Sequence, residues 1–458
     1  MSDQNGAGRK DDCGCGCGCG CGGGKKKGAG RVYRIFALTA FAALAGLAGF
    51  SVWHGKNVLN PVLHSPDDIT DDLVQRIIRN DLKSLTLDYD FTRCPGANMS
   101  EDEKDYKKEQ EKRNPFWQAN ARTPLENISF EIRFTSDVHS IACAFREFGM
   151  LKSVNVKDTS GISDMTKVFY RSPKFNQNIS RWNTSNVSSM KGMFLGASAF
   201  NQPIGSWDTS RVTSMEGMFR EAKAFNQSIE AWDTSKVTSM REMFFRAVAF
   251  NQPLEKWNVS KVTDMRMMFA GARSFNQPLA AWDTSAVDNM AGMFWEASSF
   301  NQPLEGWNTS AVTDMAIMFS STAVFNQPLG KWDTSKVASM AAMFYEASAF
   351  NQPLAAWNTS NVRDMKTMFT GAVRFNQPIE AWDTSRVGDM AMMFQGAVSF
   401  NQPLAKWNVS KVVSVNGMFK DAKAFNQSVE NWDLSSVKDA GEMFSGADAY
   451  AWPKPKLP

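Results

Sequence analysis

A unit of 25 residues, repeated eleven times without an insertion, fills about three-fifths of this 458-residue chain. Every copy begins with a Phe, and a Trp follows that Phe seven residues later. This periodicity outweighs chain length as a guide to domain number, because a repeat array folds as one quasi-linear body. The Phe column comprises Phe175, Phe200, Phe225, Phe250, Phe275, Phe300, Phe325, Phe350, Phe375, Phe400 and Phe425.

A single copy is too small to fold alone. In "FNQPLAAWNTSNVRDMKTMFTGAVR", residues 350–374, only a few large apolar side chains are available to offset the entropy of ordering the whole segment. Stacked copies cover each other's apolar surfaces and pair backbone groups between layers. We therefore expect a solenoid over residues 175–449, preceded by a degenerate capping copy at 150–174 and followed by a tail at 450–458.

Within each copy, the spacing of apolar residues predicts about two turns of helix. Met215, Met218, Phe219, Ala222 and Phe225 lie at i, i+3, i+4, i+7 and i+10, which is the pattern of one buried helical face. A short strand is expected at "xVTxM" rather than "NQPxxxW", whose recurrent Pro would remove a backbone N–H from most layers. The sequence leaves that choice open. The expected fold class is an α/β, leucine-rich-repeat-like solenoid of about eleven coils.

The residue after each Trp alternates between Asp and Asn along most of the array. A column of carboxylates one strand spacing apart would repel itself, whereas an inward-facing Asn could donate to an Asp on either side. A calcium ladder is the alternative, although Asn in every second layer argues against it. Several of these Asn residues also begin Asn-X-Ser sequons, which an inward ladder would hide, leaving Asn98 and Asn127 as better glycosylation candidates. The expected structural ladder comprises Asp233, Asn258, Asp283, Asn308, Asp333, Asn358, Asp383 and Asn408.

The N-terminal region combines a polar tail with an apolar segment. Residues 1–34 are rich in Gly, Cys and basic residues, so we expect a disordered tail. Residues 35–53 contain no charge and are long enough to cross a bilayer. The basic residues before this segment place the tail in the cytosol and the repeats outside the cell or in a lumen. A cleaved signal peptide is the alternative. Lipidation and soft-metal binding are candidate roles, with low-complexity drift as the alternative, for Cys13, Cys15, Cys17, Cys19 and Cys21.

Residues 54–149 do not show the repeat and are expected to form a membrane-side module or N-terminal cap. Thr70 is a suitable N-cap for a helix in "TDDLVQRIIRNDLKSL", and a charged helix or linker over 100–117 is expected to end at Pro115. "ISFEIRFTS" alternates as a strand does. Cys94 and Cys143 are the only cysteines after the apolar segment and form a candidate disulfide in an oxidising compartment.

Candidate binding residues are sought where the copies differ. The residue after "MF" is aromatic in every second coil at Phe245, Trp295 and Tyr345, which could form a contact face for an extended partner or could extend the hydrophobic cover at the coil edge. A second variable position is often basic, and it offers a stripe for an acidic ligand or an ordinary solvated face. Its candidate residues are Lys236, Lys261 and Arg386.

The sequence contains no recognisable catalytic constellation. The three His residues, His54, His64 and His139, lie outside the array and are not in metal-ligand spacing. Ser, Asp and Lys recur in layer after layer, so no Ser/His/Asp, Cys/His or paired-carboxylate site stands out. The net charge is only +3, without a nucleic-acid-binding pattern. We therefore expect no enzyme activity, no metal, no cofactor and no nucleic-acid partner.

The pattern "W-D/N-T-S-x-V-T-x-M-x-x-M-F-x-x-A-x-x-F-N-Q" resembles the 25-residue repeat of BspA-like leucine-rich-repeat surface proteins, a type also found in mycoplasma surface lipoproteins. The resemblance covers residues 175–449. It implies a solenoid outside the cell that functions in adhesion or in recognition of surface proteins or glycans. A structural, self-associating envelope protein is the alternative. No Cys ends the apolar segment, so residues 35–53 would replace the lipid anchor of the bacterial proteins.

Overall fold

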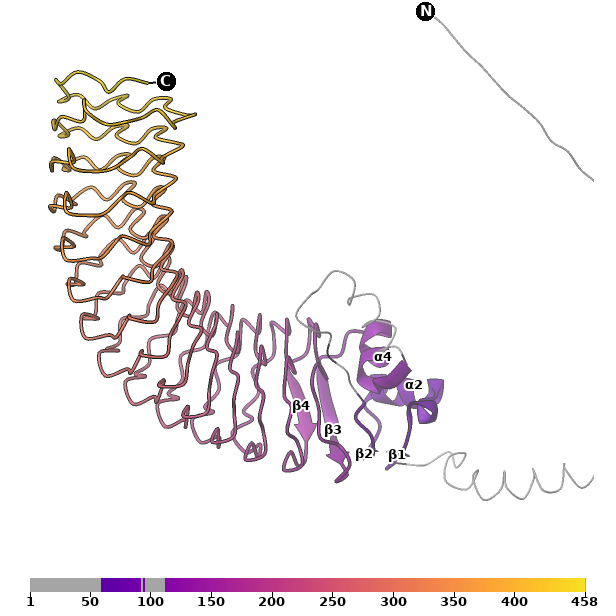
Figure 1. The fold of residues 1–458 in the computed structure, drawn as a ribbon. Coiled ribbons are helices and arrows are strands. Elements are labelled where there is room, and N and C mark those ends of the chain that lie inside the picture. The colour runs from indigo at the N-terminus through magenta and orange to yellow at the C-terminus, as the bar shows by residue number, and fades with distance from the viewer. Residues whose placement is uncertain (1–58, 92–93, 95–111, 458) are drawn as a thin grey trace, which may run out of the picture. The chain divides into compact units, whose positions relative to one another are not determined.

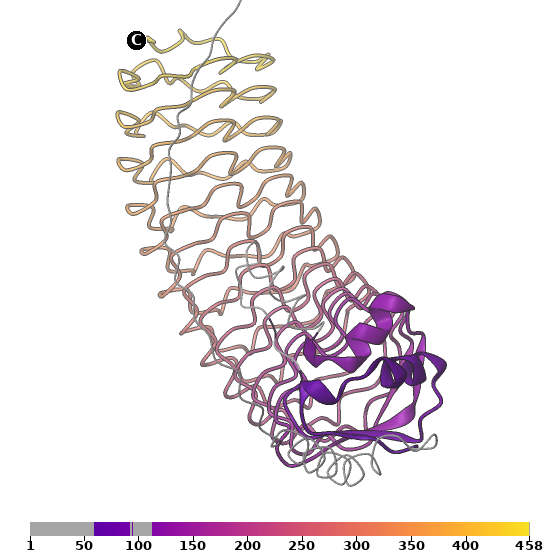
Figure 2. The same cartoon turned by 90° about the vertical axis from the view of Figure 1, so that its right-hand side faces the viewer.

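The computed structural model describes residues 59–91, 94 and 112–457. The predicted tail, the predicted span at 35–53 and all five tail cysteines lie outside these ranges. Along the described ranges, no helix combines the length and the apolarity needed to cross a bilayer. Residues from Leu59 onward form one compact unit, in which coils stack in sequence order toward the C terminus (Figures 1 and 2).

The cap is built on a parallel sheet that leads into the array. Its four strands are hydrogen-bonded in the order β1-β2-β3-β4, so each strand is a further layer of the same stack. Helix α2 packs against α4 beside these strands (Figure 1). In chain order the elements are β1 (Val62–Leu63), the 3-10 helix η1 (Pro66–Asp68), α2 (Asp71–Arg79), β2 (Ser84–Leu87), α4 (Pro115–Arg122), β3 (Asn127–Phe134) and β4 (Ser153–Val156).

The prediction for the first helix of the cap needs correction at its C-terminal end. Thr70 does cap α2, since its side chain accepts the N–H of Leu73, but the helix ends at Arg79 because Asn80 adopts the left-handed conformation with φ 58°. Residues 80–83 form the connection that follows, and Ser84 and Leu85, the end of the predicted helix, begin β2. Residues 112 and 113 are helical and Asn114 is not, so a helix does end just before Pro115, while most of the predicted segment over 100–117 lies outside the described residues. Pro115 also begins α4, since a proline at the first helical position loses no intrahelical hydrogen bond. The strand expected at "ISFEIRFTS" is present as β3.

Each coil of the array contributes one parallel bridge residue. The bridges join Ser140 to Asp164, then Asp164 to Ser189, and continue in this register to Asp439. They fall within the "xVTxM" segment, as single residues and not as strands. The first bridged coil contains Ser140, so the stack begins before residue 150, where the sequence pattern placed its start. The signal that was missed is "VHSIACAF", in which Val138, Ile141 and Phe145 are buried.

The helix predicted in every copy is wrong. Met218 N–H bonds to the carbonyl of Met215 at 3.1 Å, whereas Gly217 N–H bonds to Arg241 in the next coil at 2.8 Å. This alternation of i→i−3 turns and inter-coil bonds excludes an α-helix, whose bonds run i→i−4. Gly217 has φ +59°, which suits the third position of a tight turn. The residues expected on the buried face are nevertheless buried, because a string of turns also brings Met215, Phe219 and Ala222 to one side.

Aromatic columns run through the core of the stack. The Phe rings that begin successive copies lie about 6 Å apart, as in the pair Phe275 and Phe300 at 6.0 Å, and a second Phe column packs against them. Trp rings stack beside both, with Trp282 and Trp307 at 6.3 Å. The Trp307 Nε1–H donates to the carbonyl of Leu279 at 3.0 Å. Each Trp therefore fills the core and satisfies a backbone group of the preceding coil.

A second inter-coil ladder is made by side chains. The Asn of each "FNQ" accepts two hydrogen bonds through Oδ1, one from the backbone N–H of the next coil's Asn and one from that coil's Gln Nε2. For Asn251 the two distances are 2.9 Å to Asn276 and 3.0 Å to Gln277. In the cap, strands occupy the equivalent side, and Gln177 Oε1 accepts the N–H of Val154 in β4 at the junction. The asparagine column thus continues the sheet where Pro residues interrupt its backbone bonding.

Candidate binding surface

The aromatic column predicted as a contact face is closed at one end. Phe245 is only 7% exposed, and its ring lies 6.4 Å from that of Trp295, two coils away. The rings meet because the intervening coil carries the small, buried Ala270 at this position. The guanidinium carbons of Arg220 and Arg246 lie 4.5 and 5.1 Å from the Phe245 ring centroid and cover it further. The structure therefore assigns Phe245 to packing, which corrects the prediction that it contacts a ligand.

Trp295 and Tyr345 are half-buried and keep accessible surface. Ser320, which separates them in the column, is buried at 4% exposure. The carboxylate of Glu346 raises the pKa of the Tyr345 hydroxyl, so that group remains a neutral hydrogen-bond donor at physiological pH. These two rings are the part of the predicted aromatic face that remains available to a partner.

The Asp/Asn column is not an inter-coil ladder. Its side chains are exposed, and each accepts a hydrogen bond from the backbone N–H two residues ahead, as Asp233 does from Ser235 at 2.9 Å and Asn308 from Ser310 at 3.0 Å. Both Asp and Asn provide this oxygen acceptor, so the turn tolerates either residue. The prediction failed because it assumed an inward side chain. The members concerned are Asp233, Asn258, Asp283, Asn308, Asp333, Asn358, Asp383 and Asn408.

The same turn lowers the pKa of the aspartates in the column. The Ser235 hydroxyl and then its backbone N–H favour the charged form of Asp233 and hold its pKa below the ordinary value of 3.8. Ser335 and Ser385 act in the same way on Asp333 and Asp383. The column therefore presents a regular alternation of negative and neutral turns on the surface.

The basic positions Lys236, Lys261 and Arg386 are all exposed. Three glutamates that lie a few residues upstream of this column, Glu230, Glu305 and Glu380, each pair instead with a lysine in the next coil. The Nζ–O distances are 3.4 Å for Lys256–Glu230, 3.3 Å for Lys331–Glu305 and 3.2 Å for Lys406–Glu380. These pairs neutralise a separate column and leave the basic one without such partners.

Three basic residues from consecutive coils surround a shallow hollow of about 320 Å³. Arg363, Arg386 and Lys411 line it together with Gly388, and all three cations are exposed. Gly388 adds no side chain to the hollow, and the space beside it is open, since an added Cβ there would meet only the Arg363 carbonyl, at 3.8 Å. Arg386 Nη1 is oriented by a 2.7 Å hydrogen bond to Asn361 Oδ1.

Within the described part of the chain, none of these three cations has an ion pair within 4.0 Å. Asp383 supplies opposing charge at longer range, and its pKa is lowered first by Ser385 and then, more weakly, by Arg386. The hollow is therefore positively charged, and within the described residues no side-chain carboxylate forms an ion pair with its three cations. Sequence reasoning selected Arg386, but it missed Arg363 and Gly388, which belong to the variable column two residues further along each coil.

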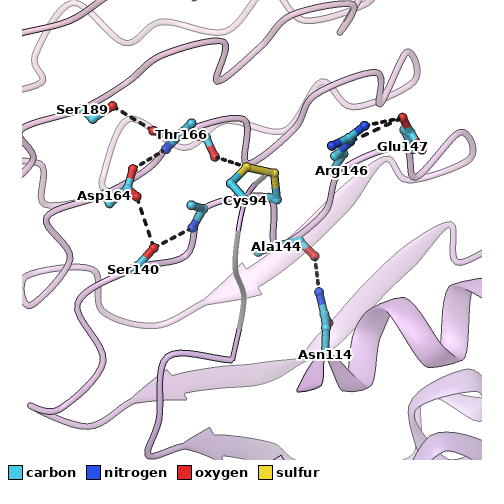
Figure 3. The surroundings of a disulfide bond; sticks show 11 residues. Cys94, Asn114, Ser140, Ala144, Arg146, Glu147, Asp164, Thr166 and Ser189 are labelled. Carbon is cyan, nitrogen blue, oxygen red and sulfur yellow. Dashed lines mark hydrogen bonds and ion pairs between the residues drawn. A yellow bond between two sulfur atoms is a disulfide. The ribbon is translucent and has the colours of Figure 1, made fainter. Parts of the chain in front are cut away.

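Cys94 and Cys143 form a disulfide, with Cα atoms 5.5 Å apart (Figure 3). It attaches the segment after β2 to the first bridged coil of the stack. Cys143 N–H bonds to the Thr166 carbonyl in the next coil at 2.8 Å, and Asn114 Nδ2, at the start of α4, bonds to the Ala144 carbonyl at 3.1 Å. The disulfide and these bonds fix the cap to the array at one place.

A comparison with protein families identifies the repeat. Five overlapping stretches match the family described as "Mycoplasma protein of unknown function, DUF285", namely residues 139–253, 205–302, 227–322, 279–374 and 353–454. The chain belongs to this family. No curated protein matches it. The match begins at residue 139, in agreement with the early start of the coil stack, and it supports a repeat protein without extending to the BspA-like resemblance.

The DUF285 coils offer little to hold a metal. Among residues 59–91, 94 and 112–457, no group of three or more His, Cys, Asp or Glu side chains could hold an ion. The carboxylates of the Asp/Asn column are bound to their own turns, which disfavours the calcium-ladder alternative. What distinguishes the DUF285 surface of this chain is the basic hollow and the half-buried rings of Trp295 and Tyr345.

Proposed function

We propose that this DUF285 protein is a membrane-anchored surface protein that recognises an acidic polysaccharide through its array. In this proposal residues 35–53 hold the protein in the membrane, the N terminus is cytosolic and the repeats are extracellular or lumenal. The array acts as a binding surface without catalytic activity or a cofactor. The observation that carries the proposal is the hollow formed by Arg363, Arg386 and Lys411, whose cations have no ion pair within 4.0 Å among the residues that the structure describes.

A repeating polyanion suits this surface because the cations recur along the stack. Arg363, Arg386 and Lys411 come from consecutive coils, whose equivalent Trp rings lie 6.3 to 6.4 Å apart, as in the pairs Trp357–Trp382 and Trp382–Trp407. Nearer the N terminus, the column of Arg386 and Lys411 also carries Lys236, Lys261 and Lys336, with Ala286, Ala311 and Asn361 at the intervening positions. Clustered charge of one sign raises the local concentration of an oppositely charged ligand and accelerates its association.

The proposal is tested by binding of the full chain to dextran sulfate, with neutral dextran as the reference polymer. We expect binding to dextran sulfate only, weakening as salt rises. The triple variant Arg363→Gln, Arg386→Gln and Lys411→Gln should lose about tenfold or more in affinity, which corresponds to about 0.5 kcal/mol per removed charge. Binding that requires an acidic protein instead of a polysaccharide would contradict the assigned ligand class.

A matched control removes the same charge from another column. The triple variant Lys256→Gln, Lys331→Gln and Lys406→Gln eliminates three lysines that are paired with glutamates. If recognition occurs at the hollow, this variant should retain affinity close to that of the wild type. An equal loss in both triple variants would reduce the effect to net charge and refute the hollow as a site.

The runner-up function is a structural protein that associates with itself through the open end of the stack. The last coil is partly covered by the C-terminal segment, in which the Tyr450 hydroxyl donates to the Pro453 carbonyl at 3.0 Å and Lys454 lies over the Phe444 ring. Pro453 and Pro455 lack the N–H groups that a further coil would pair with. The C-terminal segment therefore opposes end-to-end stacking of two copies at this coil. Concentration-dependent assembly without polyanion binding would nevertheless favour the self-associating structural protein over the proposed function.

A further inference from the structure

The exposed Asp/Asn column contains a regular series of Asn-X-Ser sequons. An inward-facing ladder would have made these sequences unusable, but the structure places their asparagines on the surface. Other sequons occur at Asn98, Asn127, Asn178, Asn186, Asn226 and Asn426, and they do not recur at every second coil. The members of the column are Asn183, Asn258, Asn308, Asn358 and Asn408.

The local geometry leaves the amide nitrogen of each column asparagine available. Oδ1 is the atom engaged: in Asn258 it accepts the Ser260 N–H at 3.1 Å and the Ser260 hydroxyl at 2.7 Å. Asn308 binds Ser310 in the same way. For the five column asparagines, all of which are described, no hydrogen bond uses Nδ2. All five asparagines are therefore on the surface with Oδ1 held by the backbone of the turn, and in Asn183, Asn258, Asn308 and Asn408 the sequon hydroxyl is bonded to the same oxygen.

The alternation with aspartate spaces these acceptors. Asn308 lies between Asp283 and Asp333, which cannot accept a glycan, so from Asn258 onward the acceptors occur on every second coil. The distance between equivalent positions of adjacent coils is given by the neighbouring Trp rings, which lie 6.3 Å apart for Trp282–Trp307 and 6.5 Å apart for Trp307–Trp332. Acceptors on adjacent coils would place two oligosaccharides only one such step apart. The observed pattern gives each oligosaccharide the width of two steps.

The compartment required for this modification is also the one in which the disulfide would form. Disulfides such as Cys94–Cys143 persist in oxidising compartments, and secretory compartments that oxidise thiols are also where Asn-X-Ser sequons are glycosylated. The disulfide and the sequon column are independent features of the chain. Both are consistent with repeats that cross into the lumen during synthesis.

We propose that the column Asn183, Asn258, Asn308, Asn358 and Asn408 is a set of N-glycosylation sites on one side of the array. The co-substrate is an oligosaccharide carried on a polyprenyl diphosphate, and a cellular transferase catalyses the step. The Asn Nδ2 forms a bond to the anomeric carbon of the sugar as the bond from that carbon to the diphosphate breaks. Nδ2 loses one proton to a base of the transferase, and the polyprenyl diphosphate departs with the electron pair.

The test is glycopeptide mapping of the full chain produced in a eukaryotic secretory host. Release with peptide N-glycosidase in ¹⁸O-water converts each modified Asn to a labelled Asp, which mass spectrometry locates. We expect label at the column asparagines. A set of Asn→Asp variants at Asn258, Asn308, Asn358 and Asn408 should lose one mobility step per occupied site and still fold, since neighbouring coils carry Asp in this turn. Ser310→Ala should remove label from Asn308 while retaining its amide.

The state of Cys94 and Cys143 is measured in the same sample by alkylation without reduction. A formed disulfide together with unlabelled column asparagines would show that the column is not an acceptor and would overturn the proposal. Free thiols and absent label together would place the repeats in a reducing compartment and overturn it as well. Loss of dextran sulfate binding with the label intact would refute the proposed function alone, so the two proposals fail separately.

Discussion

The backbone N–H of Asn326 donates to the side-chain Oδ1 of Asn301, one coil earlier, at 3.0 Å. The same oxygen accepts Gln327 Nε2 at 3.1 Å. A side chain thus provides the acceptor that a neighbouring strand would provide in a parallel sheet, and the relationship recurs from Asn176 to Asn426. The column explains why "FNQ" is so uniform: Phe packs in the core, Asn accepts and Gln donates.

Replacing Asn301 with Ala should destabilise the array locally. The partly buried N–H of Asn326 would lose its acceptor, at a cost of about 1–3 kcal/mol. Amide hydrogen exchange should show faster exchange at Asn326 and its neighbours, because the stability of a repeat array is a sum of local terms. Asn301→Asp retains the oxygen and serves as the control. Unchanged exchange at Asn326 in the Ala variant would show that the ladder contributes nothing to stability.

Trp307→Phe should be more costly than its modest change in size suggests. The Trp is 3% exposed, and its Nε1–H satisfies the Leu279 carbonyl in the preceding coil. The variant creates a small cavity and leaves a buried acceptor unpaired, so we expect a loss of about 2–4 kcal/mol in the free energy of unfolding. Urea denaturation followed by circular dichroism measures this loss. Val324→Ala, at a residue that is 45% exposed, should change stability by less than about 0.5 kcal/mol.

The sequence predicts the stack and its core well but not the path of the backbone. The spacing of apolar residues correctly predicts Met215, Met218 and Phe219 on the buried side. The same spacing does not predict their backbone conformation, since a chain of tight turns and a helix can share it. What decides between them is whether backbone N–H groups bond within a coil or to the next coil, as Gly217 does to Arg241. A single copy of the repeat contains no information on that choice.

The candidate site can be predicted only in part from the sequence, for a similar reason. Variable positions indicated Arg386, but the hollow depends on which side chains of adjacent coils meet around Gly388, and thus on the register between coils. Phe245 looked exposed because its column varies. The small size of Ala270 lets Trp295 reach it and bury it, which is a contact between coils that are not adjacent.

Acid should weaken the array partly through the Asp/Asn column. The pKa values of Asp233, Asp283, Asp333 and Asp383 lie below their ordinary 3.8, through the hydroxyl and then the N–H of the Ser two residues ahead. A carboxyl with a lowered folded-state pKa stabilises the folded state above the unfolded value and loses that contribution as pH falls through the folded value. We expect the urea concentration at the unfolding midpoint to decrease when the pH is lowered below about 4. The variant in which all four of these aspartates are replaced by Asn should show a smaller decrease in the urea midpoint between pH 6 and pH 3. A decrease equal to that of the wild type would exclude these turns as the cause.

Removing the disulfide should loosen the cap before the array. Cys94 and Cys143 are 49 residues apart, for which the chain-entropy estimate gives stabilisation of about 4 kcal/mol, with about 2–4 typical in practice. In the Cys94→Ala, Cys143→Ala variant we expect faster hydrogen exchange in α4 and β3 and a lower first unfolding midpoint. Coils near Phe350 should exchange as in the wild type. Equal acceleration along the whole array would instead indicate that cap and array unfold as one cooperative unit.

Phe245→Ala and Trp295→Ala should separate packing from recognition within one column. Phe245 is buried against Trp295 and covered by Arg220 and Arg246, so its removal should destabilise the fold by about 3–5 kcal/mol and leave dextran sulfate affinity unchanged under folding conditions. Trp295 is half-buried, so its removal should cost less stability. Trp295→Ala should also lower the affinity for a glycan or surface-protein partner found by array screening, because its ring offers open surface to a ligand. Ser320→Ala, at a buried position of the same column, is the control and should leave that affinity unchanged. If Phe245→Ala and Trp295→Ala lose the same affinity for that array partner, measured on folded protein, then binding depends on the integrity of the coil edge and not on an exposed ring.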